Sequence, residues 1–363
     1  MTMSIRNLPT NPPPTTVPRI AGFSMPPEWA RHERTWMEFP SANETFGDDV
    51  DGRLGHCRRV WASVADAIAR FEPVSLVCNV GDGEVARALV DPSIEIYETP
   101  TDDAWARDSG PTFLTHPDGR LGATHWRFNA WGNAGFSKFD DEQHVGGFIA
   151  GLAGAELFNS AMVNEGGGIH VDGEGTVMIT TTVQLDPGRN PTWNAEQVET
   201  ELKAYLGVSK VIWLPRGLTM DYGRLGTRGH VDILAAFARP GLVLAHAQLD
   251  PAHPDHEVSN EYLAVLRAST DASGRPLEVV EVPAPRTTHV DGELVDWGYI
   301  NHYVCNEAVI LCTFDDPNDE VAAEILAKAY PGRQIVLHDA RAIFECGGGI
   351  HCITQQQPAV QAV

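Results

Sequence analysis

The chain lacks the long apolar runs and the basic character that several protein classes require. No stretch of its 363 residues approaches the roughly 18 apolar residues of a membrane span, and residues 1–16 lack the apolar core of a signal peptide. Lys and Arg number 26 against 49 Asp and Glu, which gives a formal net charge of −23. Because nucleic-acid binding needs a basic surface, we expect no nucleic-acid partner. Without a membrane span or a signal peptide, we expect a cytoplasmic protein that does not bind membranes.

Several catalytic and cofactor-binding motifs are also missing. No G-x-G-x-x-G or P-loop run follows any predicted strand, and neither a G-x-S-x-G nucleophile motif nor an H-E-x-x-H metal motif occurs. The cysteines fall at no zinc-finger spacing, and without an export signal we expect their thiols to be reduced. We interpret most of them as small buried apolar residues. They are residues 57, 78, 305, 312, 346 and 352.

The pentapeptide Gly-Gly-Gly-Ile-His occurs twice. The copy at 166–170 follows Glu165 and continues with valine, whereas the copy at 347–351 continues with Cys352. The repetition indicates an internally repeated fold, and the thiol in one copy indicates a structural turn adapted for nucleophilic chemistry. We expect His170 and His351 to hydrogen-bond within their own glycine turns rather than to act in catalysis.

One unit recurs five times: an amphipathic helix, a short break and a β-branched strand. The clearest helix lies between Asn194, a predicted N-cap with Gln197 three residues later, and Gly207, which stops it. The other helices are expected over residues 56–71, 142–153, 259–269 and 320–329. The strands that follow the five helices are expected over residues 74–80, 156–158, 208–214, 277–282 and 334–337.

A polar cluster follows each of these strands. Five modules that each deliver a cluster from an equivalent position predict an α/β ring of five blades, a five-bladed α/β propeller whose clusters converge on the axis. An open doubly wound sheet is the usual alternative for alternating helices and strands, but no glycine-rich nucleotide loop supports it. We expect residues 1–21 to form a flexible Pro-rich tail, residues 22–358 a single catalytic domain, and residues 359–363 a short C-terminal tail.

Converged clusters would bring Cys352 to His230, which is the pattern of a nucleophile with an acid–base partner. If residues 230–232 form a strand, the side chains of His230 and Asp232 face the same side. Asp108, Glu165 and Asp232 together would raise the pKa of a nearby thiol unless a cation compensates. That cation could be the substrate, and a planar cation held in a fork by two carboxylates is a guanidinium.

At these residues the chain resembles the agmatine deiminase family, within the bacterial peptidylarginine-deiminase group of the guanidine-modifying (pentein) superfamily. The resemblance covers residues 25–358, and the run Gly-Gly-Gly-Ile-His-Cys-Ile-Thr-Gln-Gln-Gln-Pro that ends it is highly specific. The matching stretches are residues 35–37, 105–111, 128–132, 165–176, 229–232, 316–319 and 347–358.

The resemblance implies a five-bladed α/β propeller and a defined mechanism. The thiolate of Cys352 attacks the guanidinium carbon of agmatine, and His230 protonates the departing ammonia and later activates water. Asp108 and Asp232 hold the guanidinium, while Glu165 binds the substrate nitrogens and positions His230. The products are N-carbamoylputrescine and ammonia. Neither a metal nor an organic cofactor is implied, and the only implied partner is a small cationic guanidino substrate.

Other residues are expected to shape the pocket. Trp105 and Trp131 are interpreted as packing at its wall, and Asn301 as a further lining residue. Gly348 and Gly349, beside the thiol, leave room for a planar group to approach closely.

Three positions depart from the family pattern: Arg228 before the Gly-His-Val-Asp motif, Gly298 and His302. An arginine at the pocket mouth would repel a terminal ammonium and favour a carboxylate or neutral group. Alternatives therefore stay open: a deiminase of another guanidino compound such as a modified or peptidyl arginine, an amidinotransferase, or a non-catalytic binding propeller. The sequence also leaves open whether the chain forms a homo-oligomer.

Overall fold

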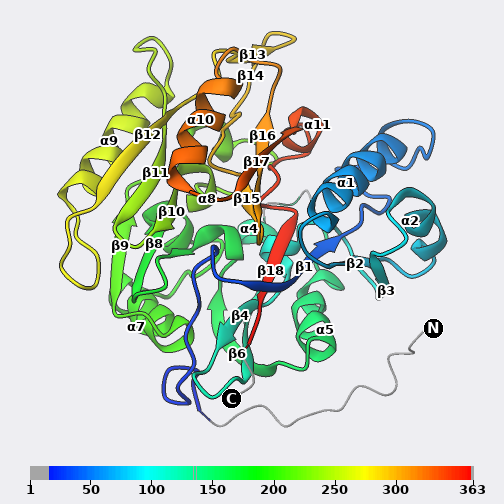
Figure 1. The fold of residues 1–363 in the computed structure, drawn as a ribbon, viewed down its shortest axis with the longest axis horizontal. Coiled ribbons are helices and arrows are strands. Elements are labelled where there is room, and N and C mark those ends of the chain that lie inside the picture. Colours follow the sequence, from blue (N-terminus) through cyan, green and yellow to red (C-terminus); the bar gives the residue numbers. More distant parts are fainter. Residues whose placement is uncertain (1–15, 134, 136, 361–363) are drawn as a thin grey trace.

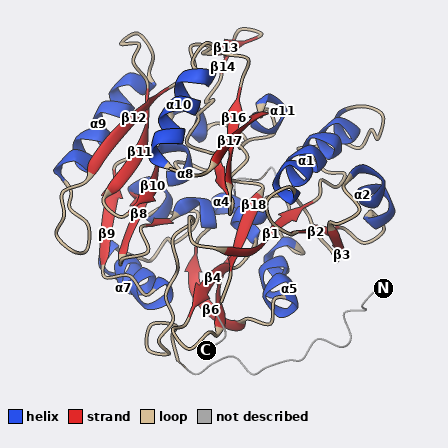
Figure 2. Cartoon of the chain, viewed as in Figure 1, coloured by secondary structure: helices blue, strands red, loops and turns tan. Residues whose placement is uncertain are grey.

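The computed structural model describes residues 16–133, 135 and 137–360. In this part of the chain the strands form one four-stranded sheet, four three-stranded sheets and one two-stranded hairpin (Figure 1, coloured along the chain; Figure 2, coloured by secondary structure). Most of the predicted N-terminal tail lies outside the described residues. Arg19, at its inner end, donates from its backbone N–H to the carbonyl of Ala204 and from Nη1 to that of Val208.

One order of pairings recurs in the three-stranded sheets. β4 (Thr112–Thr115) is antiparallel to β5 (Leu121–Arg127), which runs through helix α5 (Val145–Leu152) to a parallel partner, β6 (Glu156–Val163). The other three groups are β7 (His170–Val171), β8 (Thr176–Thr180), α7 (Ala195–Leu206) and β9 (Lys210–Leu214); β10 (Ala235–Arg239), β11 (Leu242–Ala247), α9 (Asp255–Ala268) and β12 (Glu278–Pro283); and β15 (Tyr303–Val304), β16 (Ala308–Thr313), α10 (Asp319–Ala329) and β17 (Gln334–Asp339).

The four-stranded sheet joins the two ends of the chain. β18 (Thr354–Pro358) is antiparallel to β1 (His32–Glu38), and β1 is parallel to β2 (Val74–Cys78) across helix α1 (Arg53–Ala69). A further parallel strand, β3 (Glu95–Glu98), follows helix α2 (Gly83–Leu89). The same strand, antiparallel strand, helix and parallel strand therefore occur here too. The separate hairpin consists of β13 (His289–Val290) and β14 (Glu293–Leu294).

The five predicted helix–strand units are all present, with boundaries shifted by a few residues. The prediction is most accurate at α7, where Asn194 and Gln197 form the expected capping box and Gly207 adopts a left-handed φ of +73°. The helix expected over 142–153 instead begins with a 3₁₀ turn, η2 (Glu142–His144), before α5. β6 is longer than predicted because hydrogen bonding to β5 extends it beyond its own weak strand propensity.

Residues 230–232 do not form a strand, so the condition under which His230 and Asp232 would share a strand face is not met. Residues Val231–Leu234 form a single helical turn, α8, and β10 begins only at Ala235. His230 occupies the position before this turn, with φ −51° and ψ 138°. A turn rather than a strand therefore sets the directions of the His230 and Asp232 side chains.

Aromatic packing fixes the segment that leads into β4. Trp61 of α1, fully buried, packs edge-on against both Phe46 and Trp105, at ring-centroid distances of 5.4 and 5.8 Å. Trp105 immediately precedes the short helix α3 (Ala106–Ser109). Because such pairs add about 0.5–1.5 kcal/mol beyond their burial, α1 holds this segment firmly in place.

A short turn precedes the antiparallel edge strand of each of the five larger sheets. α3 precedes β4, η3 (Gly166–Gly168) precedes β7, α8 precedes β10, Asn301 precedes β15 and Cys352 precedes β18. In Figure 1 the five long helices α1, α5, α7, α9 and α10 lie toward the outside, whereas α4 (Ala130–Asn133), α8 and β18 lie nearer the middle. Within the described residues, no helix is long and apolar enough to cross a membrane.

Candidate active site

Cys352 is 4% exposed and lies in the turn between α11 (Arg341–Phe344) and β18. Asn301 holds this turn. Its Oδ1 accepts the backbone N–H of His351 at 3.1 Å and that of Cys352 at 3.4 Å, and its Nδ2 lies 3.2 Å from the thiol sulfur. Asn301 therefore contacts the sulfur directly, as well as supporting the turn.

The glycines before Cys352 allow close packing rather than an open space. A methyl group on Gly348 would lie 2.8 Å from the Trp105 ring and 3.1 Å from the Cys352 sulfur. On Gly349 it would lie 2.4 Å from Oδ1 of Asn301. The turn can therefore lie against Trp105 and Asn301 only because both positions lack a side chain.

Asp232 is the carboxylate nearest the sulfur. Its Oδ2 accepts from the Cys352 thiol at 3.6 Å and lies 2.8 Å from Nδ1 of His351. Its Oδ1 is buried and has no hydrogen-bond partner among the described residues. One oxygen of Asp232 is thus occupied by protein groups, and the other is free for a donor that the protein does not supply.

His230 is bound through one ring nitrogen and open at the other. Nε2 lies 3.1 Å from Oε2 of Glu165, whereas Nδ1 is buried without a hydrogen-bond partner in the described part of the chain and lies 3.9 Å from Oδ2 of Asp108. Burial alone would lower the pKa of His230, but Asp108 and the hydrogen bond to Glu165 outweigh it and raise the pKa to about 9. The ring is therefore an imidazolium at neutral pH.

Glu165 is fully buried and is held by Arg189. Nε of Arg189 lies 3.0 Å from each carboxylate oxygen, and its Nη1 and Nη2 contact Asp186 and the carbonyl of Thr227 at 2.8 Å. Burial favours the neutral acid, but the Arg189 charge and the His230 hydrogen bond lower the pKa of Glu165 to about 2. Glu165 is therefore a charged acceptor that orients His230.

Asp108 faces the same space from α3. Its Oδ2 accepts from Nε1 of Trp131 at 2.8 Å, and its Oδ1 accepts from the backbone N–H of Gly167 at 3.0 Å. Burial, together with the Glu165 and Asp232 charges, raises the pKa of Asp108, although His230 opposes this. Trp131 also packs edge-on against Phe128 at 5.2 Å, so it supports the carboxylate as well as forming part of the wall.

Gly167, in the middle of the first glycine turn, lies where three of these groups meet. A methyl group there would lie 2.5 Å from Nδ1 of His230, 2.9 Å from Oδ2 of Asp232 and 3.0 Å from Oδ1 of Asp108. The absence of a side chain at this position allows the imidazole and the two carboxylates to share one small space.

The environment of Cys352 disfavours its thiolate. Burial comes first, and the Asp232 and Asp108 charges add to it, so the pKa of Cys352 is raised well above its usual value. A cation that entered between these carboxylates would offset their effect. The site is therefore arranged so that a positively charged ligand would activate the thiol.

The sequence model of the Porphyromonas-type peptidyl-arginine deiminase family matches residues 24–358. The chain belongs to this family. A Streptomyces avermitilis protein with a provisional agmatine deiminase name is 57% identical over 94% of this chain and 99% of its own length. The agmatine deiminase of Enterococcus faecalis is 31% identical in sequence, with a TM-score of 0.88 over 96% of this chain and 98% of that one.

A third relative was solved with substrate. It is a cysteine-to-serine form of the C. jejuni agmatine deiminase, 25% identical, with a TM-score of 0.82 over 93% of this chain and 97% of that one. These solved deiminases also give this chain its fold class, the pentein α/β fold.

Two site residues of this family member escaped the sequence analysis. Arg189 carried no signal, because a single arginine in a Gly-Arg-Asn-Pro loop has no motif of its own. Gly167 was visible only as one glycine of a repeat.

In addition, the expectation that His170 and His351 bond within their own glycine turns was wrong for both. The His351 ring contacts Asp232 and Glu28, and the His170 ring contacts Glu28 and the backbone N–H of Phe237, all of them far away in sequence.

Arg228 is half-exposed, and its charge is paired. Its Nη1 lies 2.9 Å from Oδ1 of Asp186, the same carboxylate that binds Arg189. The residue has a left-handed φ of +69°, which is uncommon outside glycine. Because the carboxylate of Asp186 offsets the charge of Arg228, the pair repels a cationic ligand less than an unpaired arginine would.

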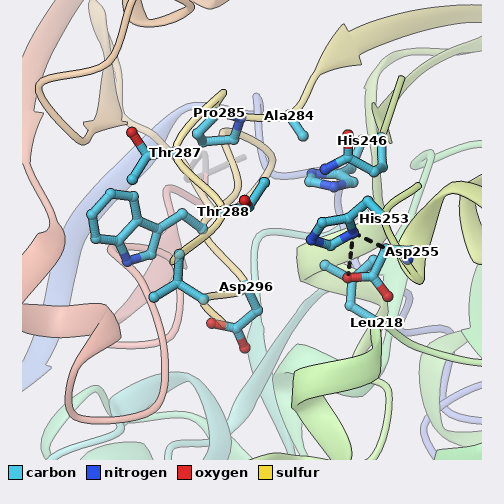
Figure 3. A pocket seen from close by; sticks show the side chains of 12 residues that line it. Leu218, His246, His253, Asp255, Ala284, Pro285, Thr287, Thr288 and Asp296 are labelled. Atoms are coloured by element: carbon cyan, nitrogen blue, oxygen red, sulfur yellow. Dashed lines mark hydrogen bonds and ion pairs between the residues drawn. The ribbon is translucent and has the colours of Figure 1, made fainter. Parts of the chain in front are cut away.

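Two cavities are separate from this candidate site. The one in Figure 3 lies between Leu218, His253–Asp255 and the 284–297 segment, and its free volume of ≈ 10 Å³ suits about one water molecule. The second, ≈ 260 Å³, is lined by residues of 26–31, 115–119 and 358–360. Neither includes Cys352, His230 or Asp232. Within the described residues, no group of three or more His, Cys, Asp or Glu side chains is placed to hold a metal.

Proposed function

We propose that this chain hydrolyses the guanidinium group of agmatine, giving N-carbamoylputrescine and ammonia. The observation that carries the proposal is a pair of buried atoms without hydrogen-bond partners, Oδ1 of Asp232 and Nδ1 of His230, on two side chains that both approach Gly167. The acceptor Asp232 matches a cationic N–H donor, and His230 is a proton donor at the place where ammonia would leave. The names of the relatives support the same reaction.

Asp108 and Asp232 would bind the guanidinium. At about 4 Å and an effective dielectric constant near 20, each carboxylate contributes roughly 4 kcal/mol of attraction before desolvation is subtracted. The bound cation also stabilises the Cys352 thiolate, because it offsets the two charges that raise the thiol pKa. Substrate binding and nucleophile activation are therefore one event.

The reaction then proceeds through a covalent intermediate. The Cys352 sulfur attacks the guanidinium carbon, and the C–N bond breaks as His230 gives its proton to the departing ammonia. The remaining S-alkylthiouronium is attacked by water, whose proton passes to His230. Collapse of that adduct breaks the C–S bond as its hydroxyl proton is lost to solvent, and it releases the ureido product and the thiolate. Glu165 holds His230 in both steps rather than binding the substrate, since Arg189 and His230 occupy its oxygens.

A guanidino compound with a carboxylate tail is the rival substrate. The sequence favoured such a substrate because Arg228 would repel an ammonium tail. The ion pair between Arg228 and Asp186 weakens this repulsion. The 57% identity to a protein with an agmatine deiminase name favours agmatine. Trp105, Gly348 and Gly349 would then shape the walls around the guanidinium.

We also infer that the five larger sheets are the blades of a propeller within a single domain of residues 22–358. The recurring order of antiparallel pair, helix and parallel strand supports this. The position of each short turn, directly before the antiparallel edge strand of its sheet, supports it too.

The test is a ureido-product and ammonia assay across agmatine, arginine, N-acetylarginine and guanidinobutyrate, with Cys352→Ala as the control. We expect agmatine to give the highest kcat/KM and Cys352→Ala to give no product. A preference for a carboxylate-bearing compound would overturn the substrate assignment. Ammonia release that required an added amine acceptor would indicate a transferase instead.

A further inference from the structure

The two Gly-Gly-Gly-Ile-His copies meet at one buried carboxylate. Nε2 of His351 lies 2.7 Å from Oε1 of Glu28, and Nε2 of His170 lies 3.5 Å from Oε2 of the same residue. The two imidazole rings are stacked, with centroids 6.4 Å apart and an interplanar angle of 24°. All three residues are at most 5% exposed. Glu28 therefore links the two copies of the motif.

The two histidines differ in what lies at their other nitrogen. Nδ1 of His170 accepts the backbone N–H of Phe237 at 3.3 Å, so its proton lies on Nε2, facing Glu28, and the ring is neutral. Nδ1 of His351 instead lies 2.8 Å from Oδ2 of Asp232. Both nitrogens of His351 thus face carboxylate oxygens, which only accept. A neutral ring could donate to one of them only. Because the pKa values of Glu28 and Asp232 are both lowered and the two carboxylates stay ionised, the geometry favours a doubly protonated ring.

The charged groups around His351 agree with this state. Glu28 and Asp232 face it from two sides, and Arg107 of α3, 3.5 Å from Oε1 of Glu28, opposes them. Burial and Arg107 lower the pKa of His351, but Glu28 and Asp232 outweigh them and raise it. His302 lies in the same region, where burial lowers its pKa to about 4, so it carries no competing charge.

The charged ring of His351 determines the orientation and charge of Asp232. His351 and the Cys352 thiol both occupy Oδ2, which leaves Oδ1 unpaired. Burial raises the pKa of Asp232, but the hydrogen bond and charge of His351 outweigh it and lower the pKa. His351 therefore fixes the orientation of this carboxylate and keeps it ionised.

We propose that Glu28 and His351 are positioning residues: Glu28 holds His351 as an imidazolium, and His351 presents the free oxygen of Asp232 to the substrate guanidinium. His170 contacts the same Glu28 but has no such role, because the other nitrogen of its ring accepts from the backbone of β10 and not from a side chain of the site. The role in substrate binding rests on the proposed function, but the protonation state of His351 does not.

The protonation state is tested first, without substrate. The full-length protein is labelled with ¹⁵N-histidine, and the ring nitrogens are assigned by comparison with His351→Asn and His170→Asn. At pH 7.5 we expect imidazolium signals for His351 and a neutral ring protonated at Nε2 for His170. In Glu28→Gln, which loses the charge and can donate from its amide to Nε2, His351 should become neutral. Neutral-ring signals for His351 in the wild type would overturn the proposal.

Kinetics test the consequence for binding. His351→Asn should raise KM for agmatine roughly tenfold, about the effect of losing one hydrogen bond to a charged group, with a smaller change in kcat. Glu28→Gln should shift KM in the same direction by less, and His170→Asn, the matched control, should leave KM within about twofold of wild type. Equal KM values for the two histidine variants would overturn the positioning role. A wild type inactive on agmatine with His351 still an imidazolium would instead refute the proposed function alone.

Discussion

Nε of Arg189 lies 3.0 Å from both carboxylate oxygens of Glu165, in the middle of the protein and out of contact with solvent. The same guanidinium also binds Asp186, which in turn binds the half-exposed Arg228. The charge on Glu165, and through it the orientation of His230, therefore depends on a residue that does not reach the proposed substrate position.

Arg189→Ala should destabilise the protein strongly. Removing one partner of a buried ion pair leaves an uncompensated charge, which typically costs about 3–5 kcal/mol. Chemical unfolding of the purified variant measures this cost. The control is Arg216→Ala, which breaks the partly exposed pair with Glu261 and should cost less than about 1 kcal/mol. Similar losses in both variants would contradict a special role for the buried pair.

Gly167→Ala should abolish turnover, because its methyl group would lie 2.5 Å from the His230 ring and within 3.0 Å of Asp232 and Asp108. We expect kcat/KM to fall at least a hundredfold, or about 2.7 kcal/mol in the barrier.

Gly147→Ala is the matched control. Gly147 lies within helix α5, and its methyl group would lie 4.0 Å from its nearest neighbours, His125 and Leu157, so we expect unchanged activity and a stability gain of about 0.5–1 kcal/mol.

Asp108→Asn should change two properties of the site in opposite directions. Without the charge of Asp108 the pKa of Cys352 falls, so alkylation of that thiol by iodoacetamide should be faster than in wild type at pH 8. Deimination should become slower, because one of the two carboxylates that bind the guanidinium is lost. Peptide mass spectrometry distinguishes Cys352 from the other five cysteines, all of them buried. Slower alkylation would show that Asp108 does not act on the sulfur.

Local signals explain what the sequence could predict. The capping box between Asn194 and Gln197 involves residues three apart, and Gly207 ends the helix through its own backbone preference. Similarity to the family motifs predicted Cys352, His230 and the carboxylates as site residues, because the chemistry of each follows from its residue type. These predictions required no knowledge of which segments pack together.

The remaining features depend on contacts between distant segments. Glu28 reaches His351 across almost the whole chain, and no periodicity or motif marks Glu28 as more than a surface residue. His351 was assigned a partner within its own turn because only the local sequence was available. Likewise, the helical turn at Val231–Leu234 has no local signal: it places His230 and Asp232 against Gly167, a residue distant in sequence, before β10 begins.

The stability of the folded protein should decrease between pH 6.5 and 9 because of His230. Its folded-state pKa of about 9 lies above the unfolded value near 6.5, so its contribution is complete below pH 6.5 and is lost as pH rises through 9. The shift corresponds to roughly 3 kcal/mol at most. Asp103, whose pKa burial raises to about 7, lowers stability mainly between pH 4 and 7.

Several buried cysteines and tyrosines with raised pKa values begin to lower stability above about pH 8.5, so the interval from pH 7 to 8.5 reports mainly on His230 and His351, the two histidines with raised pKa values. Thermal unfolding of the wild type and of His230→Gln across this interval provides the measurement. We expect the wild-type Tm to fall by several degrees and the variant Tm to fall by less, because glutamine does not titrate whereas His351, whose pKa is also raised, still does. Parallel slopes in the two proteins would mean that His230 is not an imidazolium in the folded state, and the departing ammonia would then lack the proton donor that the mechanism requires.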